Sequence, residues 1–128
     1  MPDYNLHHTH DISEFCFLVT GGAGFIGSNL VAYLLHFGAK KVRVLDNFSN
    51  GYRDNLKEFM GNPKFELMEG DIRDLNTCRL ALEHMDYVSH QAALGSVPRS
   101  INDPVTTNEV NISGFLNMMI ALKESTTV

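Results

Sequence analysis

Three glycines spaced at intervals of three residues, Gly21, Gly24 and Gly27, could form a phosphate-binding loop. Gly21 permits a tight turn, Gly24 lets the backbone approach a diphosphate, and Gly27 lets a following helix pack closely. A helix that begins here offers free N–H groups and the positive end of its dipole to phosphates. The triplet also follows an apolar strand-like run and opens a helix-like one. This context predicts a dinucleotide-binding loop.

An acidic residue, Asp46, ends the next apolar run along the chain. A carboxylate at the end of that strand can accept hydrogen bonds from the adenine ribose, and it would repel a 2′-phosphate. The pattern therefore favours NAD over NADP, with a loop-capping aspartate as the alternative. Arg43 and Arg53 lie close by in the sequence, so the preference for NAD is not absolute.

Strand and helix patterns alternate along the chain and must position these residues. The continuous apolar run 15–20 is typical of a strand buried in a parallel sheet. The segments 42–45, 65–68, which alternates, and 87–90 are interpreted as three further strands. Helical patterns occupy 26–35, a short segment that ends at Gly61, and the segments after Asp74 and Pro104. This order predicts an α/β fold: a Rossmann-like, doubly wound parallel sheet, truncated at about four strands in the order 3-2-1-4.

Local signals mark where the helices begin and end. Gly38 is a C-terminal stop, and Asp74 and Asp103 are suited to cap the helices that follow them. Pro98 and Pro104 predict a loop between them.

Composition excludes several classes of protein. The 128 residues carry 10 Lys+Arg against 15 Asp+Glu, a net charge of −5, which argues against a nucleic-acid binder. No apolar run approaches the ~20 residues that a membrane span needs, and the start of the chain does not resemble a signal peptide. Cys16 and Cys78 lack metal-type spacing and indicate reduced thiols. We expect a cytoplasmic protein.

The first 14 residues are polar and without periodicity, and we expect them to form a leader to the folded unit 15–128. His7, His8 and His10 in this leader invite a metal-binding interpretation. A ligand cluster needs a folded frame and supporting partners, so we expect a solvated tail and no metal site.

Four segments carry a resemblance to a known family: TGGAGFIGSNL (20–30), LDNFSNG (45–51), GDIRDL (70–75) and HQAALGSVPRS (90–100). Together they resemble the extended short-chain dehydrogenase/reductases, the NAD-dependent epimerase/dehydratase family. The last segment is most similar to the branch of bacterial UDP-N-acetylglucosamine 4-epimerases, isomerases of polysaccharide biosynthesis. The resemblance covers 15 to about 123. It implies a partial NAD-binding domain, with NAD as cofactor and a UDP-sugar as substrate.

The resemblance assigns roles to matching positions in this sequence. Its cofactor contacts are Gly21, Gly24, Phe25, Ile26 and Gly27 at the pyrophosphate, Asp46, Asn47, Phe48, Ser49 and Gly51 at the adenine ribose, Asp71 and Ile72 at the adenine, and Gln91, Ala92 and Ala93 at the nicotinamide. Its substrate contacts are Gly95, Ser96 and Arg99. Packing alone is the alternative for the two alanines, and a solvated loop cation is the alternative for the arginine. Val110 stands where the family has a polar residue.

The epimerase reaction needs a tyrosine with a lysine four residues later, and this chain has no such pair. Its tyrosines are Tyr4, Tyr33, Tyr52 and Tyr87, and the residues four positions on are His8, Phe37, Leu56 and Gln91. We therefore expect no catalytic residue here, and we expect the catalytic segment and the C-terminal substrate domain of the family to be absent. The chain would be the inactive N-terminal part of a UDP-N-acetylhexosamine 4-epimerase. The alternatives are a nucleotide-sugar 4,6-dehydratase or decarboxylase relative, or a non-enzymatic dinucleotide-binding module.

The predicted sheet order leaves the fourth strand at an edge. An apolar edge strand tends to recruit another chain. We therefore expect a homo-oligomer that forms through this strand or through the last helix.

Overall fold

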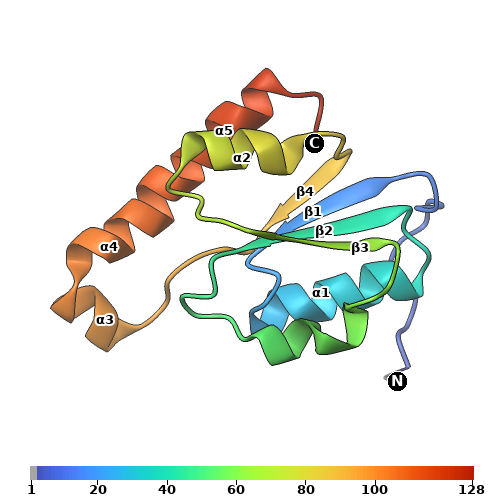
Figure 1. Cartoon of the computed structure of the whole chain (residues 1–128), viewed down its shortest axis with the longest axis horizontal. Coiled ribbons are helices and arrows are strands. Elements are labelled where there is room, and N and C mark those ends of the chain that lie inside the picture. The colour runs from blue at the N-terminus through green and yellow to red at the C-terminus, as the bar shows by residue number, and fades with distance from the viewer. Residues whose placement is uncertain (1–2) are drawn as a thin grey trace.

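Four parallel strands form one sheet in the computed structural model, which describes residues 3–128 (Figure 1). They are β1 (Cys16–Thr20), β2 (Lys41–Asp46), β3 (Phe65–Glu69) and β4 (Tyr87–His90). Their order is β3-β2-β1-β4, which confirms the predicted Rossmann-like arrangement. The chain therefore leaves β1 on one side for β2 and β3, and returns on the other side for β4.

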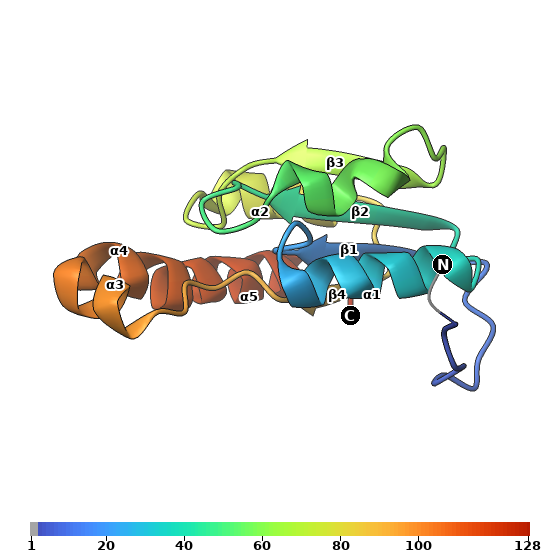
Figure 2. The same cartoon turned by 90° about the horizontal axis from the view of Figure 1, so that it is seen from below.

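Helices cover both faces of the sheet (Figures 1 and 2). One face carries α1 (Phe25–His36) and a 3-10 helix, η1 (Arg53–Phe59). The other carries α2 (Leu75–Leu82) and α5 (Phe115–Glu124). Between β4 and α5 the chain forms α3 (Val97–Asn102), α4 (Pro104–Asn108) and a π-helical stretch, η2 (Glu109–Gly114).

Two apolar cores, one on each face, explain why apolar side chains of β1 and β2 point to both sides of the sheet. Leu18 and Leu45 pack against α2 and α5, whereas Val19 and Val44 pack against α1 and η1. All four side chains are at most 1% exposed. Successive residues of a strand point to opposite faces, so a strand covered on both sides is apolar at most positions. Arg43 in β2 is an exception.

The predicted helix ends are confirmed at three positions. Asp74 Oδ1 accepts hydrogen bonds from the N–H groups of Asn76 (2.9 Å) and Thr77 (3.3 Å) at the start of α2. Asp103 caps α4 in the same way, and Gly38 follows α1 with φ +81°. The predicted loop between the two prolines is wrong, because Val97–Asn102 forms the short helix α3.

The leader does not form the solvated tail that its composition predicts. The Tyr33 hydroxyl on α1 accepts a hydrogen bond from the His7 N–H (2.9 Å) and lies 2.6 Å from His8 Nδ1. The Tyr4 ring packs against His36, with 5.3 Å between ring centroids. Aromatic side chains on the outer face of α1 thus offer a surface that the leader covers.

The outer edge of β4 is partly paired. Val128 donates to the Asp86 carbonyl (2.8 Å), and Val88 donates to the Val128 carbonyl (2.7 Å). One residue bonded to both neighbours of a facing residue is the pattern of a parallel ladder. The predicted free edge is therefore occupied at its beginning.

Candidate functional site

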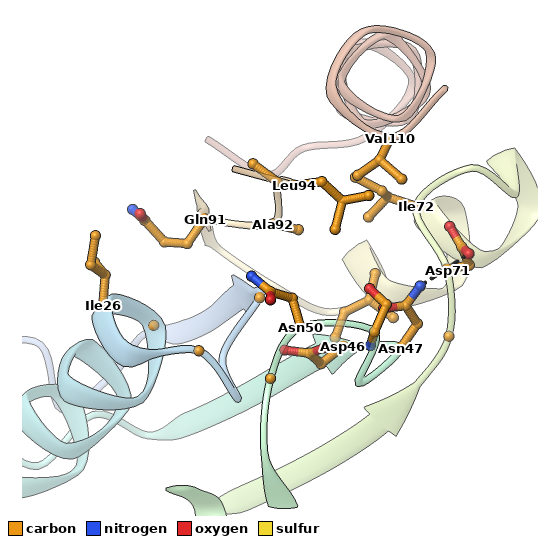
Figure 3. Close-up of a pocket in the computed structure, with 18 of the residues that line it drawn as sticks. Ile26, Asp46, Asn47, Asn50, Asp71, Ile72, Gln91, Ala92, Leu94 and Val110 are labelled. Atoms are coloured by element: carbon orange, nitrogen blue, oxygen red, sulfur yellow. Dashed lines mark hydrogen bonds between the residues drawn. The ribbon is translucent and has the colours of Figure 1, made fainter. Parts of the chain in front are cut away.

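A cavity of about 300 Å³ lies at the carboxyl ends of the four strands (Figure 3). It sits where the chain order reverses, between the loop that follows β1 and the loop that follows β4. Open α/β sheets bind their ligands at this switch point, because the loops there diverge to opposite faces.

The glycine loop lines the part of this cavity that lies next to α1. Gly21 has φ +68°, and a Cβ there would lie 2.8 Å from the Ala92 nitrogen. A Cβ on Gly27 would lie 2.2 Å from the Gly21 carbonyl oxygen, so only glycine lets α1 begin this close to β1. The N-terminus of α1 has no side-chain cap and no acidic residue in its first turn. These features fit the cradle of a diphosphate.

Asp46 stands at the end of β2 and is 9% exposed. Its Oδ2 accepts from the Ala23 N–H (2.9 Å), and its Oδ1 accepts from the Phe48 N–H (2.8 Å). Asp46 also lines the cavity, and each of its carboxylate oxygens has a further lone pair that can accept a hydrogen bond.

The two arginines close to Asp46 in the sequence are both engaged elsewhere. Arg43 is buried, and its Nη1 donates to the carbonyls of Ala81 (2.8 Å) and Glu83 (2.9 Å) at the end of α2. Arg53 pairs with Glu69 at 2.7 Å and lies 4.1 Å above the centre of the Phe48 ring. Neither residue lines the cavity, and no arginine is among the cavity-lining residues within the part of the chain that the structure describes.

The far end of the cavity carries a second carboxylate, Asp71, in the loop after β3. Asn47 Nδ2 donates to it at 3.1 Å (Figure 3), and the Arg73 guanidinium donates at 2.7 Å. Hydrogen bonds from Arg73 hold the pKa of Asp71 below its ordinary value and outweigh the effect of burial. The group is therefore an ionised hydrogen-bond acceptor at neutral pH.

The loop after β4 is fixed by the buried hydroxyl of Thr20. This oxygen accepts from the N–H groups of Gln91 (3.0 Å) and Ala92 (3.1 Å) and lies 2.8 Å from His90 Nδ1. Both acceptor positions of the hydroxyl oxygen are occupied, so the hydroxyl donates its own proton to His90. Nδ1 of His90 must then be unprotonated in order to accept it. Burial lowers the pKa of His90 in agreement. His90 is thus packed and does not line the cavity.

Nearly all the predicted cofactor-binding residues meet in this one cavity. Those that line it are Gly21, Gly24, Phe25, Ile26, Gly27, Asp46, Asn47, Ser49, Gly51, Asp71, Ile72, Gln91, Ala92 and Ala93. Phe48 does not: it has φ +59°, and its ring packs into the core beneath Arg53. A positive φ angle at a phenylalanine cannot be predicted from the sequence.

The predicted substrate residues lie outside the cavity lining. Ser96 Oγ accepts from the Arg99 N–H at 3.3 Å and so caps α3. Gly95 is exposed, and a Cβ there would meet nothing within 4 Å. Arg99 Nη1 is buried and has no hydrogen-bond partner within residues 3–128.

The cavity also has lining residues that are not among the predicted cofactor contacts: Leu45, Asn50, Gly70, Leu94 and Val110. Val110 supplies an apolar wall where the family has a polar residue. Leu94 is fixed by Asn111, whose side chain donates to its carbonyl and accepts from its N–H, both at 2.8 Å.

Within the described residues, no group of three or more His, Cys, Asp or Glu side chains could hold a metal ion. No helix among residues 3–128 is both long and apolar enough to cross a membrane.

Comparisons with known proteins agree with this geometry. Residues 18–128 match the family model described as GDP-mannose 4,6 dehydratase. UDP-glucuronic acid decarboxylase 5 of Arabidopsis thaliana is 39% identical over 112 residues, which cover 84% of this chain and 31% of that protein.

Two solved structures have a similar fold. UDP-glucose 4-epimerase of Thermus thermophilus in complex with NAD has a TM-score of 0.74 and 41% identity, over 85% of this chain and 34% of that one. UDP-N-acetylglucosamine 4-epimerase of Methanobrevibacter ruminantium in complex with UDP-N-acetylmuramic acid has a TM-score of 0.80 and 36% identity, over 90% of this chain and 36% of that one. The chain spans 31% to 36% of the length of these three relatives. It belongs to the GDP-mannose 4,6-dehydratase family, within the NAD-dependent epimerases, dehydratases and decarboxylases that act on nucleotide sugars.

Proposed function

We propose that this chain is the NAD-binding part of a nucleotide-sugar 4-epimerase whose substrate is a UDP-N-acetylhexosamine. The observation that carries the cofactor assignment is the cavity itself. It joins a glycine cradle at α1 to one carboxylate at the end of β2 and a second one after β3. In a dinucleotide, the diphosphate would lie at the glycine cradle, the adenine ribose at the first carboxylate and the adenine amine at the second.

Each of these parts has a defined task toward the cofactor. The first turn of α1 binds the diphosphate through main-chain N–H groups. Asp46 accepts from the adenine ribose hydroxyls, and Asp71 accepts from the adenine amine. Ala92 and Ala93 leave space for the nicotinamide ribose and ring. NAD, when bound, supplies a hydride acceptor for oxidation at the sugar C4.

The chain by itself lacks the tyrosine–lysine pair that moves the sugar proton in the family. None of its four tyrosines has a lysine four residues on, as the tyrosinate base of the family requires. We therefore propose that it binds the cofactor but does not turn over substrate alone.

The sugar specificity rests on the segment after β4. Arg99 lies in α3, and its buried Nη1 has no hydrogen-bond partner among residues 3–128, so a negatively charged group of a sugar nucleotide would satisfy it. Gly95 and Ser96 complete this proposed contact. The similarity to the epimerase bound to UDP-N-acetylmuramic acid supports an N-acetylated sugar, whereas the plant decarboxylase relative favours decarboxylation as the second candidate.

Calorimetric titration with NAD and with NADP tests the cofactor assignment. We expect NAD to bind more tightly than NADP, and the folded protein to lack turnover of UDP-N-acetylglucosamine. A folded sample that binds neither dinucleotide at millimolar concentration would contradict the proposal. Turnover by this chain alone would contradict the account of the missing base.

We further propose that the protein is cytoplasmic and self-associates. Both cysteines are free, as a reducing compartment allows. Ile112, Phe115, Leu116 and Met119 are between 46% and 61% exposed along η2 and α5, a large apolar surface for one helix.

A further inference from the structure

We propose that Glu69 is a positioning residue that helps to select the cofactor, because it holds the Arg53 guanidinium away from the adenine ribose and so denies a cation to the 2′-phosphate of NADP. The inference rests on the proposed function, since it requires a dinucleotide in the cavity. Glu69 does not line the cavity and would act through Arg53. This role is distinct from the repulsion that Asp46 would exert directly on a 2′-phosphate.

Glu69 ends β3 beside the end of β2. It is the register partner of Asp46 in the parallel ladder between the two strands, and neighbouring strands lie only about 5 Å apart. Val44 and Leu67, two residues earlier in each strand, both pack in the apolar core that includes α1 and η1. Because side chains alternate along a strand, Asp46 and Glu69 point to this same face. The two carboxylates therefore lie on neighbouring strand ends, on the side that carries η1.

Arg53 reaches Glu69 from the start of η1. Its Nη2 donates to Glu69 Oε2 at 2.7 Å, and its guanidinium carbon lies 4.1 Å from the centre of the Phe48 ring. Phe48 lies between two residues that line the cavity, Asn47 and Ser49. The guanidinium is therefore held against the loop that forms this wall of the cavity, without lining the cavity itself.

The main chain keeps Arg53 near Asp46. The N–H of Tyr52, the residue before Arg53, donates to the Ala23 carbonyl (3.1 Å), and the Ala23 N–H donates to Asp46 Oδ2 (2.9 Å). Gly51, one residue earlier, lines the cavity. One alanine thus links the residue before Arg53 to the carboxylate that faces the ribose. The long side chain of an arginine can cover this span once its partner is removed.

The charges around the ribose position explain why this matters for NADP. Among the cavity-lining residues within 3–128 there is no lysine or arginine, so a 2′-phosphate would meet Asp46 without a compensating cation. Arg53 could supply that cation, because a guanidinium binds phosphate oxygens through paired N–H groups. In the wild type, however, turning Arg53 toward a phosphate would leave Glu69 and Asp46 as neighbouring unpaired carboxylates. This repulsion opposes the exchange, although an exposed ion pair contributes little to folding.

A second ion pair provides a matched control. Arg79 pairs with Glu124 through Nε (2.7 Å) and Nη2 (3.0 Å), and the two side chains are similarly exposed. This pair joins α2 to α5, and neither residue lines the cavity. Glu124→Gln therefore releases an arginine of the same kind without changing the charges near the ribose.

The test is calorimetric titration of the whole chain with NAD and with NADP at neutral pH. We expect Glu69→Gln to tighten NADP binding by about fivefold or more, as a hydrogen bond to a charged group does, and to leave NAD binding unchanged. Arg53→Gln alone should not alter NADP binding, because the wild type already withholds this arginine. Adding Arg53→Gln to Glu69→Gln should abolish the gain, and Glu124→Gln should produce none.

The outcomes separate this inference from the proposed function. A wild type that binds neither dinucleotide refutes the proposed function and this inference with it. NAD binding without a gain for NADP in Glu69→Gln overturns the role of Glu69 and leaves the NAD site in place. A gain that survives the addition of Arg53→Gln also overturns it, because the effect is then only the loss of a negative charge. If Glu69→Gln fails to fold by circular dichroism, Glu69→Thr, which suits a strand, replaces it with the same expectations.

Discussion

The main-chain N–H of Ala23, inside the glycine loop, donates a 2.9 Å hydrogen bond to the carboxylate of Asp46 at the end of β2. The carbonyl of the same alanine accepts from the Tyr52 N–H (3.1 Å) and from Asn55 Nδ2 (2.8 Å). Asp46 is therefore part of the frame that shapes the loop, in addition to any contact with a ribose. Its two roles predict a defined result on mutation.

Asp46→Asn should lower both stability and affinity. An amide presents only one acceptor to the two N–H groups that the carboxylate now satisfies, so a buried donor is left unpaired at a cost of about 1–3 kcal/mol. We expect chemical denaturation to show this loss, and calorimetry to show weaker NAD binding without a gain for NADP. Asp54→Asn, on the exposed surface of η1, is the control. Tight NADP binding by Asp46→Asn would indicate that Asp46 acts only by repelling the 2′-phosphate of NADP.

Gly27→Ala should disrupt the start of α1. The added methyl would lie 2.2 Å from the Gly21 carbonyl oxygen, which is backbone and cannot turn away. Overpacking of this kind costs about 1–3 kcal/mol or more. Denaturant unfolding should show the loss together with weakened NAD binding. For stability alone, Gly95→Ala is the control because its methyl would meet open space; equal stability of the two variants would refute the close approach.

Acid should destabilise the fold through His90. Burial lowers its pKa from 6.5, so below that value the unfolded chain binds a proton that the folded chain resists. The contribution of His90 is complete above pH 6.5 and is lost as the pH falls through the lower pKa of the folded state. Denaturation curves between pH 8 and pH 5 should therefore show declining stability.

His90→Gln should flatten this pH dependence. The glutamine amide can still accept from the Thr20 hydroxyl and does not titrate. His10→Gln in the exposed part of the leader should keep the wild-type dependence. If His90→Gln retains the full slope, another group carries it.

Self-association should depend on the apolar face of η2 and α5. Leu116→Glu places a charge on a side chain that is 56% exposed in the single chain, so it should leave folding intact and weaken assembly. Size-exclusion chromatography with light scattering measures the result. Met60→Glu, at a similarly exposed position after η1, should not alter it. A wild type that stays monomeric at high concentration would rule out this surface.

Sequence patterns predict the parts of the fold that can be recognised from residues close together in the chain. The caps Asp74 and Asp103 bond N–H groups two or three residues along the chain. The glycine loop and Asp46 are recognisable from their spacing, although Asp46 bonds Ala23 from 23 residues away. Leu94 could not be found in this way, because it reaches the cavity only after the sheet order brings the loop after β4 close to the glycine loop.

The misplaced elements have physical reasons too. The polarity of the leader predicts a solvated tail, but it gives no sign of the aromatic surface that Tyr33 and Phe37 present on α1. The family resemblance assigns Phe48 to the ribose, but no pattern in the sequence signals its left-handed backbone or the packing of its ring against the core. Tertiary contacts decide both cases.

The π-helical stretch Glu109–Gly114 also sets an angular relation that the site depends on. Asn111, within it, grips the loop after β4, whereas Asn117, beyond it, grips the loop after β3. Each residue of a regular helix advances by about 100°, so shortening the wide turn by a single residue would rotate everything downstream by about that angle. Asn117 would then lose its hydrogen bonds to the carbonyls of Ile72 and Arg73. The loops after β3 and β4 would no longer be held in a fixed relation by the same helical segment.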